Sequence, residues 1–236
     1  MTQHIGIVGC SAEGAALCYR TVCLEGEDLL GPYDHPEVTL HTFPLATYMA
    51  AIERDDWPAV GQLMLASARK LHAAGADFLI CPDNTIHRAL PFALERSPLP
   101  WLHIAAVVAA EARRRGWRRL GLTGTRFLVD SGVYPGELAA QGLECVRPAP
   151  EERTIINHYI FEELVRGVRS PEAIAYFQQV FTRMREAGCD AVVLGCTEIP
   201  LLMSDANSPL PTLDSTRLLA RAALRRATGQ EPAPPT

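Results

Sequence analysis

Two short polar segments follow apolar runs of the sequence at matching places. The segment DNT at 83–85 comes after a run that begins AGADFLIC, and CTE at 196–198 comes after AGCDAVVLG, with a constant offset of 113 residues. A carboxylate and a thiol can both transfer protons, so Asp83 and Cys196 are the candidate catalytic residues. Their equivalent positions suggest that they act as a pair.

A second pair of matching segments extends this repeat. The stretch IGIVGC at 5–10 corresponds to LGLTGT at 120–125, with an offset of 115 residues. We therefore expect two related halves. The alternative is that the repeat reflects shared folding signals alone, because Ala-Gly before an apolar strand is common in α/β proteins.

Apolar runs alternate with helical periodicity, which is typical of parallel α/β sheets. We expect strands at 5–9, 38–43, 76–81, 119–124 and 190–195, with helices near 13–25 and 58–74. Ile156, Ile160 and Leu164 predict another helix. A further helix is capped by Ser170 and ended by Gly188.

The predicted fold class is α/β, with two pseudo-symmetric domains, mostly parallel sheets and an active site in the cleft between them. One domain comprises 1–112 plus 212–236, including a C-terminal helix and a disordered tail at 230–236, and the other comprises 113–211. Ligands bind beyond the carboxyl ends of parallel strands, which is where the two polar segments fall.

Charge and composition exclude several classes of protein. The 236 residues include 22 basic and 27 acidic ones, for a net charge of −5, so we expect neither nucleic acid nor a membrane surface as a partner. We expect a cytoplasmic homodimer that acts on a small carboxylate or amino acid. The seven cysteines form no CxxC pair and are expected to be free thiols.

No cofactor and no metal are expected. The chain lacks the usual nucleotide-binding glycine loops and the HExxH zinc motif. Its only lysine, Lys70, lies in a helical run, which is a poor place for Schiff-base chemistry. Cys81, Asp83 and His87 do not have the spacing of a metal site.

Six further residues are candidate substrate-binding groups because they are polar and follow predicted strands. They are Ser11, Asn84, Thr85, Thr125, Thr197 and Glu198. Ser11 and Thr125 could bind a substrate carboxylate or cap helices, and Glu198 could orient Thr197 or serve a structural role. Arg126 is a candidate cation for the substrate, or a solvent-facing residue.

Several motifs together resemble the aspartate/glutamate racemase superfamily over residues 5–227. They are GxSxE at 9–13 (Gly9, Ser11 and Glu13), NTxH at 84–87, GTRF at 124–127, IFEEL at 160–164 and GCTEIPLL at 195–202. The resemblance implies a cofactor-independent amino-acid racemase for aspartate, glutamate or a related acid. In that mechanism two cysteines transfer protons on opposite faces of the carbon next to a carboxylate.

The sequence departs from the family pattern at a central position. Asp83 stands where the first cysteine is normal, and Cys81 is expected to lie too deep in the strand to replace it. Leu128 and Leu219 also stand where relatives often carry threonine and histidine. The chain could therefore be a racemase with unlike bases, a single-cysteine decarboxylase or cis-trans isomerase related to arylmalonate decarboxylase and maleate isomerase, or a non-catalytic carboxylate-binding relative.

Overall fold

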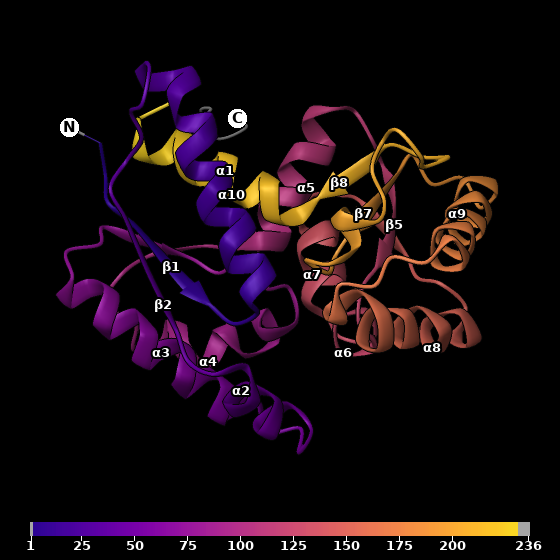
Figure 1. Ribbon diagram of the computed structural model, residues 1–236, viewed down its shortest axis with the longest axis horizontal. Coiled ribbons are helices and arrows are strands. Elements are labelled where there is room, and N and C mark those ends of the chain that lie inside the picture. Colours follow the sequence, from indigo (N-terminus) through magenta and orange to yellow (C-terminus); the bar gives the residue numbers. More distant parts are fainter. Residues whose placement is uncertain (1, 231–236) are drawn as a thin grey trace. The chain divides into compact units, whose positions relative to one another are not determined.

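A computed structural model describes residues 2–230 of the chain (Figure 1). The chain forms two compact units: unit 1 runs from Met1 to Ile104 and resumes at Thr216, and unit 2 is the single stretch Ala105–Ser215. Domain limits at 112 and 212 stay a prediction. Most of the tail predicted to be disordered lies outside the described residues.

Unit 1 contains a four-stranded parallel sheet with the order β2-β1-β3-β4. Its strands are β1 Ile5–Gly9, β2 Val38–Thr42, β3 Phe78–Ile80 and β4 Trp101–Leu102. Its helices are α1 Ala12–Leu30, α2 Leu45–Ile52, α3 Trp57–Ala73, α4 Leu90–Leu94 and α10 Ser215–Ala227. The central strands β1 and β3 are buried along their whole length, as expected for apolar strands inside a parallel sheet.

Unit 2 contains a second four-stranded parallel sheet with the order β6-β5-β7-β8. Its strands are β5 Arg119–Thr123, β6 Glu144–Val146, β7 Ala191–Leu194 and β8 Thr212–Asp214. Its helices are α5 Ile104–Arg114, α6 Arg126–Val129, α7 Val133–Ala140, α8 Pro150–His158 and α9 Pro171–Glu186. Phe177 and Phe181 of α9 belong to the same buried cluster as Val192 and Leu194 of β7.

The two sheets have the same strand order when β5 to β8 are matched with β1 to β4. In each unit the first strand lies between the second and the third. The predicted α/β class, with two related halves of parallel strands, is confirmed.

The helix predicted from Ile156, Ile160 and Leu164 is not a regular α-helix throughout. α8 ends at His158, a π turn covers Tyr159–Glu163, and a 3-10 turn covers Leu164–Arg166. Apolar residues spaced by four drift around a helix of 3.6 residues per turn, and the wider π turn offsets that drift. All three apolar side chains are consequently buried.

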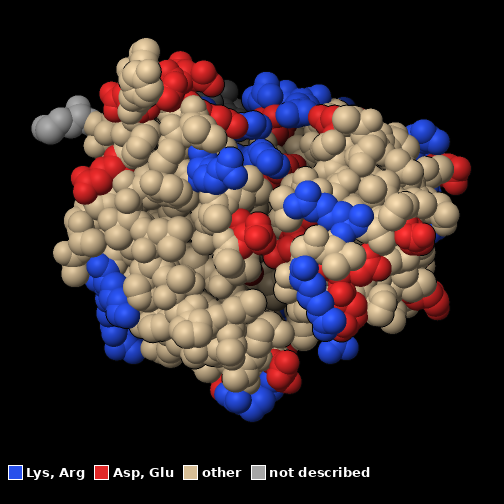
Figure 2. All heavy atoms as spheres, in the orientation of Figure 1, with Lys and Arg blue, Asp and Glu red and all other residues tan. Residues whose placement is uncertain are grey.

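Charged residues of both signs are scattered in small groups on the face drawn in Figure 2. The described residues on that face form no continuous basic surface. Among the described residues, no helix is long and apolar enough to span a membrane.

Candidate active site

In unit 1, the candidate residues follow β3 in a tight turn. Asp83 lies three residues after the strand, and its Oδ1 accepts a hydrogen bond from the Ile86 backbone N–H at 3.1 Å. Asn84 is buried, and Thr85 begins the 3-10 turn Thr85–Ala89. The carboxylate of Asp83 is therefore anchored by the backbone of the turn that it starts.

The imidazole of His87 forms hydrogen bonds that connect the same turn to Ile104. The Ile104 backbone N–H donates to its Nε2 at 3.3 Å, so Nδ1 carries the proton and donates to the Asp83 carbonyl oxygen at 2.7 Å. Burial, with a smaller contribution from His103, lowers the pKa of His87 to about 3. His87 is thus a neutral positioning residue that links Asp83 to Ile104, the last residue of the first segment of unit 1.

Cys81 is unsuited to replace the missing first cysteine. Its side chain is fully buried, and its thiol lies 4.0 Å from the Asp83 carbonyl oxygen. Burial, reinforced by the charge of Asp83, raises the pKa of the Cys81 thiol well above its ordinary value. A buried thiol of this kind is a poor proton acceptor.

In unit 2, Cys196 lies two residues after β7 and is 8% exposed. Its thiol donates a hydrogen bond to Oε2 of Glu198 at 2.9 Å, and the Thr197 hydroxyl donates to the same oxygen at 2.8 Å. All three residues are buried. One carboxylate oxygen thus holds both the thiol and its neighbouring hydroxyl.

Glycines allow the backbone before Cys196 to pack closely. The Gly195 N–H donates to the Thr123 carbonyl oxygen at 2.9 Å, and a Cβ on Gly195 would lie 2.6 Å from that oxygen. The same Cβ would lie 2.7 Å from Cδ2 of Leu128, which also packs against Gly124. Leu128, which stands where the resemblance implies a threonine, therefore supplies packing at this point.

Ser11 and Thr125 both cap helices. Ser11 accepts a hydrogen bond from the Gly14 N–H at 3.3 Å at the start of α1, and Thr125 accepts one from the Leu128 N–H at 3.3 Å at the start of α6. Their structural role is thus visible, and a role in substrate binding stays a prediction.

Strand pairing brings the candidate residues together within each unit. β1 pairs with β3, so Ser11 lies at the same edge of its sheet as the segment 83–85. β5 pairs with β7, so Thr125 lies at the same edge of its sheet as the segment 196–198. Each sheet therefore gathers its own half of the predicted site.

Two features of the site were not identified from the sequence. The sequence places His87 in the NTxH motif, where it could contact the substrate or cap the local helix, and only its position four residues after Asp83 indicates a contact across one turn. The shared use of Glu198 by two donors has no sequence signal beyond adjacency. The described residues contain no cluster of three or more His, Cys, Asp or Glu that could hold a metal ion.

The sequence model of the Asp/Glu/Hydantoin racemase family matches residues 7–223. The chain belongs to this family. The resemblance seen in its motifs is thereby confirmed, and membership supports an isomerase of the amino-acid racemase type.

Three relatives illustrate the range of similarity. Broad specificity amino-acid racemase RacX from Bacillus subtilis (strain 168) is 22% identical over 193 residues, covering 80% of this chain and 81% of RacX. The structure of a candidate Asp/Glu racemase from Yersinia pestis has a TM-score of 0.89 and 29% identity, covering 95% of this chain and 99% of that protein. The structure of an aspartate racemase homologue from Pyrococcus horikoshii OT3 has a TM-score of 0.83 and 26% identity, covering 97% of this chain and 100% of that protein.

Proposed function

We propose that this protein is a cofactor-independent amino-acid racemase in which Cys196 and Asp83 exchange the proton on the carbon next to the substrate carboxylate. Cys196 serves one face of that carbon and Asp83 serves the other. The pairing of the two residues rests on their equivalent places in two halves of the same strand order.

The contact between Cys196 and Glu198 carries this proposal. A thiol 2.9 Å from a buried carboxylate has a proton acceptor within direct reach. Glu198 can take the proton of Cys196 and leave a thiolate, which is the form of cysteine that acts as a base. The Thr197 hydroxyl keeps the receiving oxygen in place.

The proton transfers balance in both directions. In one direction Glu198 first takes the thiol proton of Cys196. The thiolate then takes the α-proton, the electron pair of the C–H bond moves into the carboxylate to form an enediolate, and the protonated Asp83 returns a proton on the opposite face. Transfer of the Glu198 proton to Asp83 through solvent then restores the starting state. In the other direction the Asp83 carboxylate takes the proton and the Cys196 thiol returns one. Backbone N–H groups in the loops after the strands can stabilise the enediolate.

A second candidate function is favoured by the capping role of Asp83. Its Oδ1 already accepts the Ile86 N–H, as a purely structural aspartate would. Cys196 would then act alone as the protonating acid of a decarboxylase or a cis-trans isomerase of the same fold, or the protein would only bind carboxylates.

The substrate is an amino acid in this proposal. The support is the similarity to RacX, a broad specificity amino-acid racemase, together with membership of the family. Aspartate, glutamate and neutral amino acids are all included as substrates to be tested. A cytoplasmic homodimer stays a prediction from the sequence.

The test is hydrogen exchange in D2O with a panel of amino acids and substituted malonates. A racemase incorporates deuterium at the α-carbon and inverts configuration, whereas a decarboxylase releases CO2 and leaves single amino acids unchanged. A protein that does neither, while still binding carboxylates, would contradict both enzymatic proposals.

Two cysteine variants make the test specific. Cys196→Ala is expected to lower the exchange rate by about 10³-fold, the usual scale for loss of a general acid or base. Cys189→Ala is the matched control, because Cys189 precedes the same strand and burial raises the pKa of its thiol. Equal losses in both variants would indicate damage to folding rather than to chemistry.

A further inference from the structure

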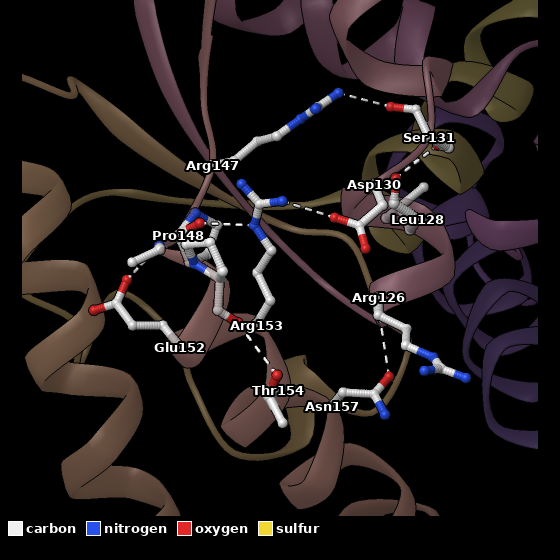
Figure 3. A network of polar contacts seen from close by, with 12 residues as sticks. Arg126, Leu128, Asp130, Ser131, Arg147, Pro148, Glu152, Arg153, Thr154 and Asn157 are labelled. Carbon is white, nitrogen blue, oxygen red and sulfur yellow. Dashed lines mark hydrogen bonds and ion pairs between the residues drawn. The ribbon is translucent and has the colours of Figure 1, made fainter.

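A hollow of about 270 Å³ lies between α6 and α8 in unit 2. It is lined by Arg126, Asp130, Pro150, Arg153, Thr154 and Asn157. The two helices also contact each other directly. Figure 3 shows these side chains from close by.

Most of the polar groups in the hollow are already satisfied. Arg153 donates to Asp130 Oδ1 at 2.8 Å and to the Pro148 carbonyl oxygen at 2.7 Å. The Thr154 hydroxyl donates to the Pro150 carbonyl oxygen at 3.2 Å. These contacts hold Arg153 and Thr154 in place on one side of the hollow.

Two donors at the other end of the hollow have no acceptor among the described residues. Asn157 uses its Oδ1 to accept the Arg126 backbone N–H at 3.1 Å, which leaves its Nδ2 group unused. The Arg126 guanidinium forms no ion pair in the described part of the chain and lies 5.0 Å from the centroid of the Phe127 ring. In Figure 3 it extends away from the Asp130–Arg153 pair.

The lining favours an anion of low charge. Arg126 and Arg153 against Asp130 leave one net positive charge, two minus one, around the hollow. A planar guanidinium and an amide NH2 suit the two oxygens of a carboxylate. The charge of Asp130 would oppose a phosphate dianion more than a carboxylate.

We infer that Arg126 and Asn157 form a carboxylate-binding site in this hollow. The carboxylate comes either from a free small acid or from the far end of a dicarboxylic substrate. Arg126 directly follows Thr125, and Gly124 packs against Gly195, the residue before Cys196. The second source rests on the proposed racemase function, whereas the first does not.

Binding is measured without any activity, by titrating succinate into the 15N-labelled protein and following the Arg126 Nε–H and Asn157 Nδ2–H2 signals by NMR. We expect saturable shifts at these two groups. Arg126→Gln removes the positive charge. Asn157→Asp keeps the oxygen that accepts the Arg126 N–H, but it replaces the amide donor with a negatively charged oxygen that repels a carboxylate. Both variants should weaken succinate binding at least tenfold.

Arg185→Gln is the matched control, because it removes one positive charge from an exposed position of α9 in the same unit. Binding should be unchanged in this variant. Absence of saturable binding, or equal affinity in Arg126→Gln and Arg185→Gln, would overturn the inference, whatever the activity of the enzyme.

A kinetic measurement then identifies the source of the carboxylate. If the far end of the substrate binds here, Arg126→Gln should raise KM at least tenfold for aspartate and leave KM for alanine unchanged. If a free acid binds here, the same variant loses succinate binding with no change in either KM. Both results support the site, and they distinguish its two occupants.

Discussion

Glu198 is a buried carboxylate whose oxygen accepts hydrogen bonds from two neighbouring residues. Because that oxygen lies beside the Cys196 sulfur, it can receive the thiol proton, and its charge opposes a second negative charge on sulfur. The resting pair thus consists of a thiol and a carboxylate. This arrangement makes Glu198 a proton relay in the proposed reaction.

Glu198→Gln should lower kcat about 10²-fold, because the amide keeps the shape but cannot take the thiol proton. The rate of Cys196 alkylation by iodoacetamide at fixed pH should rise, since no negative charge opposes the thiolate. Thr197→Val is the comparison variant, because it removes a hydroxyl that donates to the same oxygen and keeps the carboxylate of Glu198. Unchanged kcat together with unchanged alkylation would exclude the relay.

His87 gives the turn after β3 a pH-dependent stability. In the unfolded chain His87 has an ordinary histidine pKa of 6.5, whereas in the folded chain burial lowers its pKa to about 3. Between these values the unfolded state binds more protons, so stability falls as the pH is lowered. Because of His87, the free energy of unfolding is about 2 kcal/mol lower at pH 5 than at pH 8.

His87→Gln tests this dependence. Glutamine can donate to the Asp83 carbonyl and accept from the Ile104 N–H, but it does not titrate. The free energy of unfolding, measured by urea denaturation at several pH values, should fall by about 2 kcal/mol less from pH 8 to pH 5 in the variant than in the parent. Identical slopes for the two proteins would show that another group causes the acid sensitivity.

At the scale of elements, the loops after β5 and β7 depend on close backbone packing. Gly195→Ala would bring a methyl group to 2.6 Å from a backbone oxygen that cannot move freely. We expect a loss of about 2 kcal/mol in the free energy of unfolding, with reduced activity because Cys196 is the next residue.

Gly136→Ala is the matched control for this prediction. Gly136 lies within α7, and a Cβ there meets nothing within 4 Å. Alanine in a helix interior is favoured over glycine by about 0.5–1 kcal/mol, so this variant should be slightly more stable. Thermal or urea unfolding measures both changes, and similar effects in the two variants would argue against the packing explanation.

The elements that the sequence predicts well are those with a continuous apolar run or with clear capping residues. β1, β3, β5 and β7 are central strands with apolar runs, and α9 has both a capping serine and an ending glycine. β4, β6 and β8 have two or three residues each and lie at or near sheet edges, so they leave no clear pattern. The π turn after α8 also departs from a regular helix, because tertiary packing decides it.

The candidate site was predictable only in part, for a similar reason. Asp83 and Cys196 follow strands that repeat, so their positions could be read from the spacing. The hydrogen bonds of Glu198 and His87 depend on side-chain orientation, which spacing does not determine. The hollow at Arg126 depends on where α6 meets α8.

For the whole molecule, the two halves share a strand order but carry different groups at the paired positions, a carboxylate at Asp83 and a thiol at Cys196. Asp83→Cys would place a thiol in both repeats. If the halves are functionally equivalent, this variant should show racemisation of amino acids that is at least tenfold faster than in the parent. Chiral chromatography of products measures it, with circular dichroism as a check on folding.

Asp83→Asn is the companion variant, because it keeps the oxygen that accepts the Ile86 N–H but removes the acid. It should abolish exchange from one face of the substrate and preserve exchange at the face served by Cys196. A change in KM alone, with the stereochemical course intact, would assign Asp83 to binding or structure.

The discontinuity of unit 1 has a consequence for how the chain is made. Unit 2 is one continuous stretch, whereas unit 1 needs α10, whose Arg221 forms two hydrogen bonds with Glu25 of α1 at 2.6 and 2.8 Å. The Gln3 N–H also donates to the Ala227 carbonyl oxygen. A ribosome therefore releases every residue of unit 2 before it releases the last helix of unit 1. The half synthesised first is the half completed last, and the nascent chain must keep a unit that still lacks its last helix from aggregating until α10 emerges.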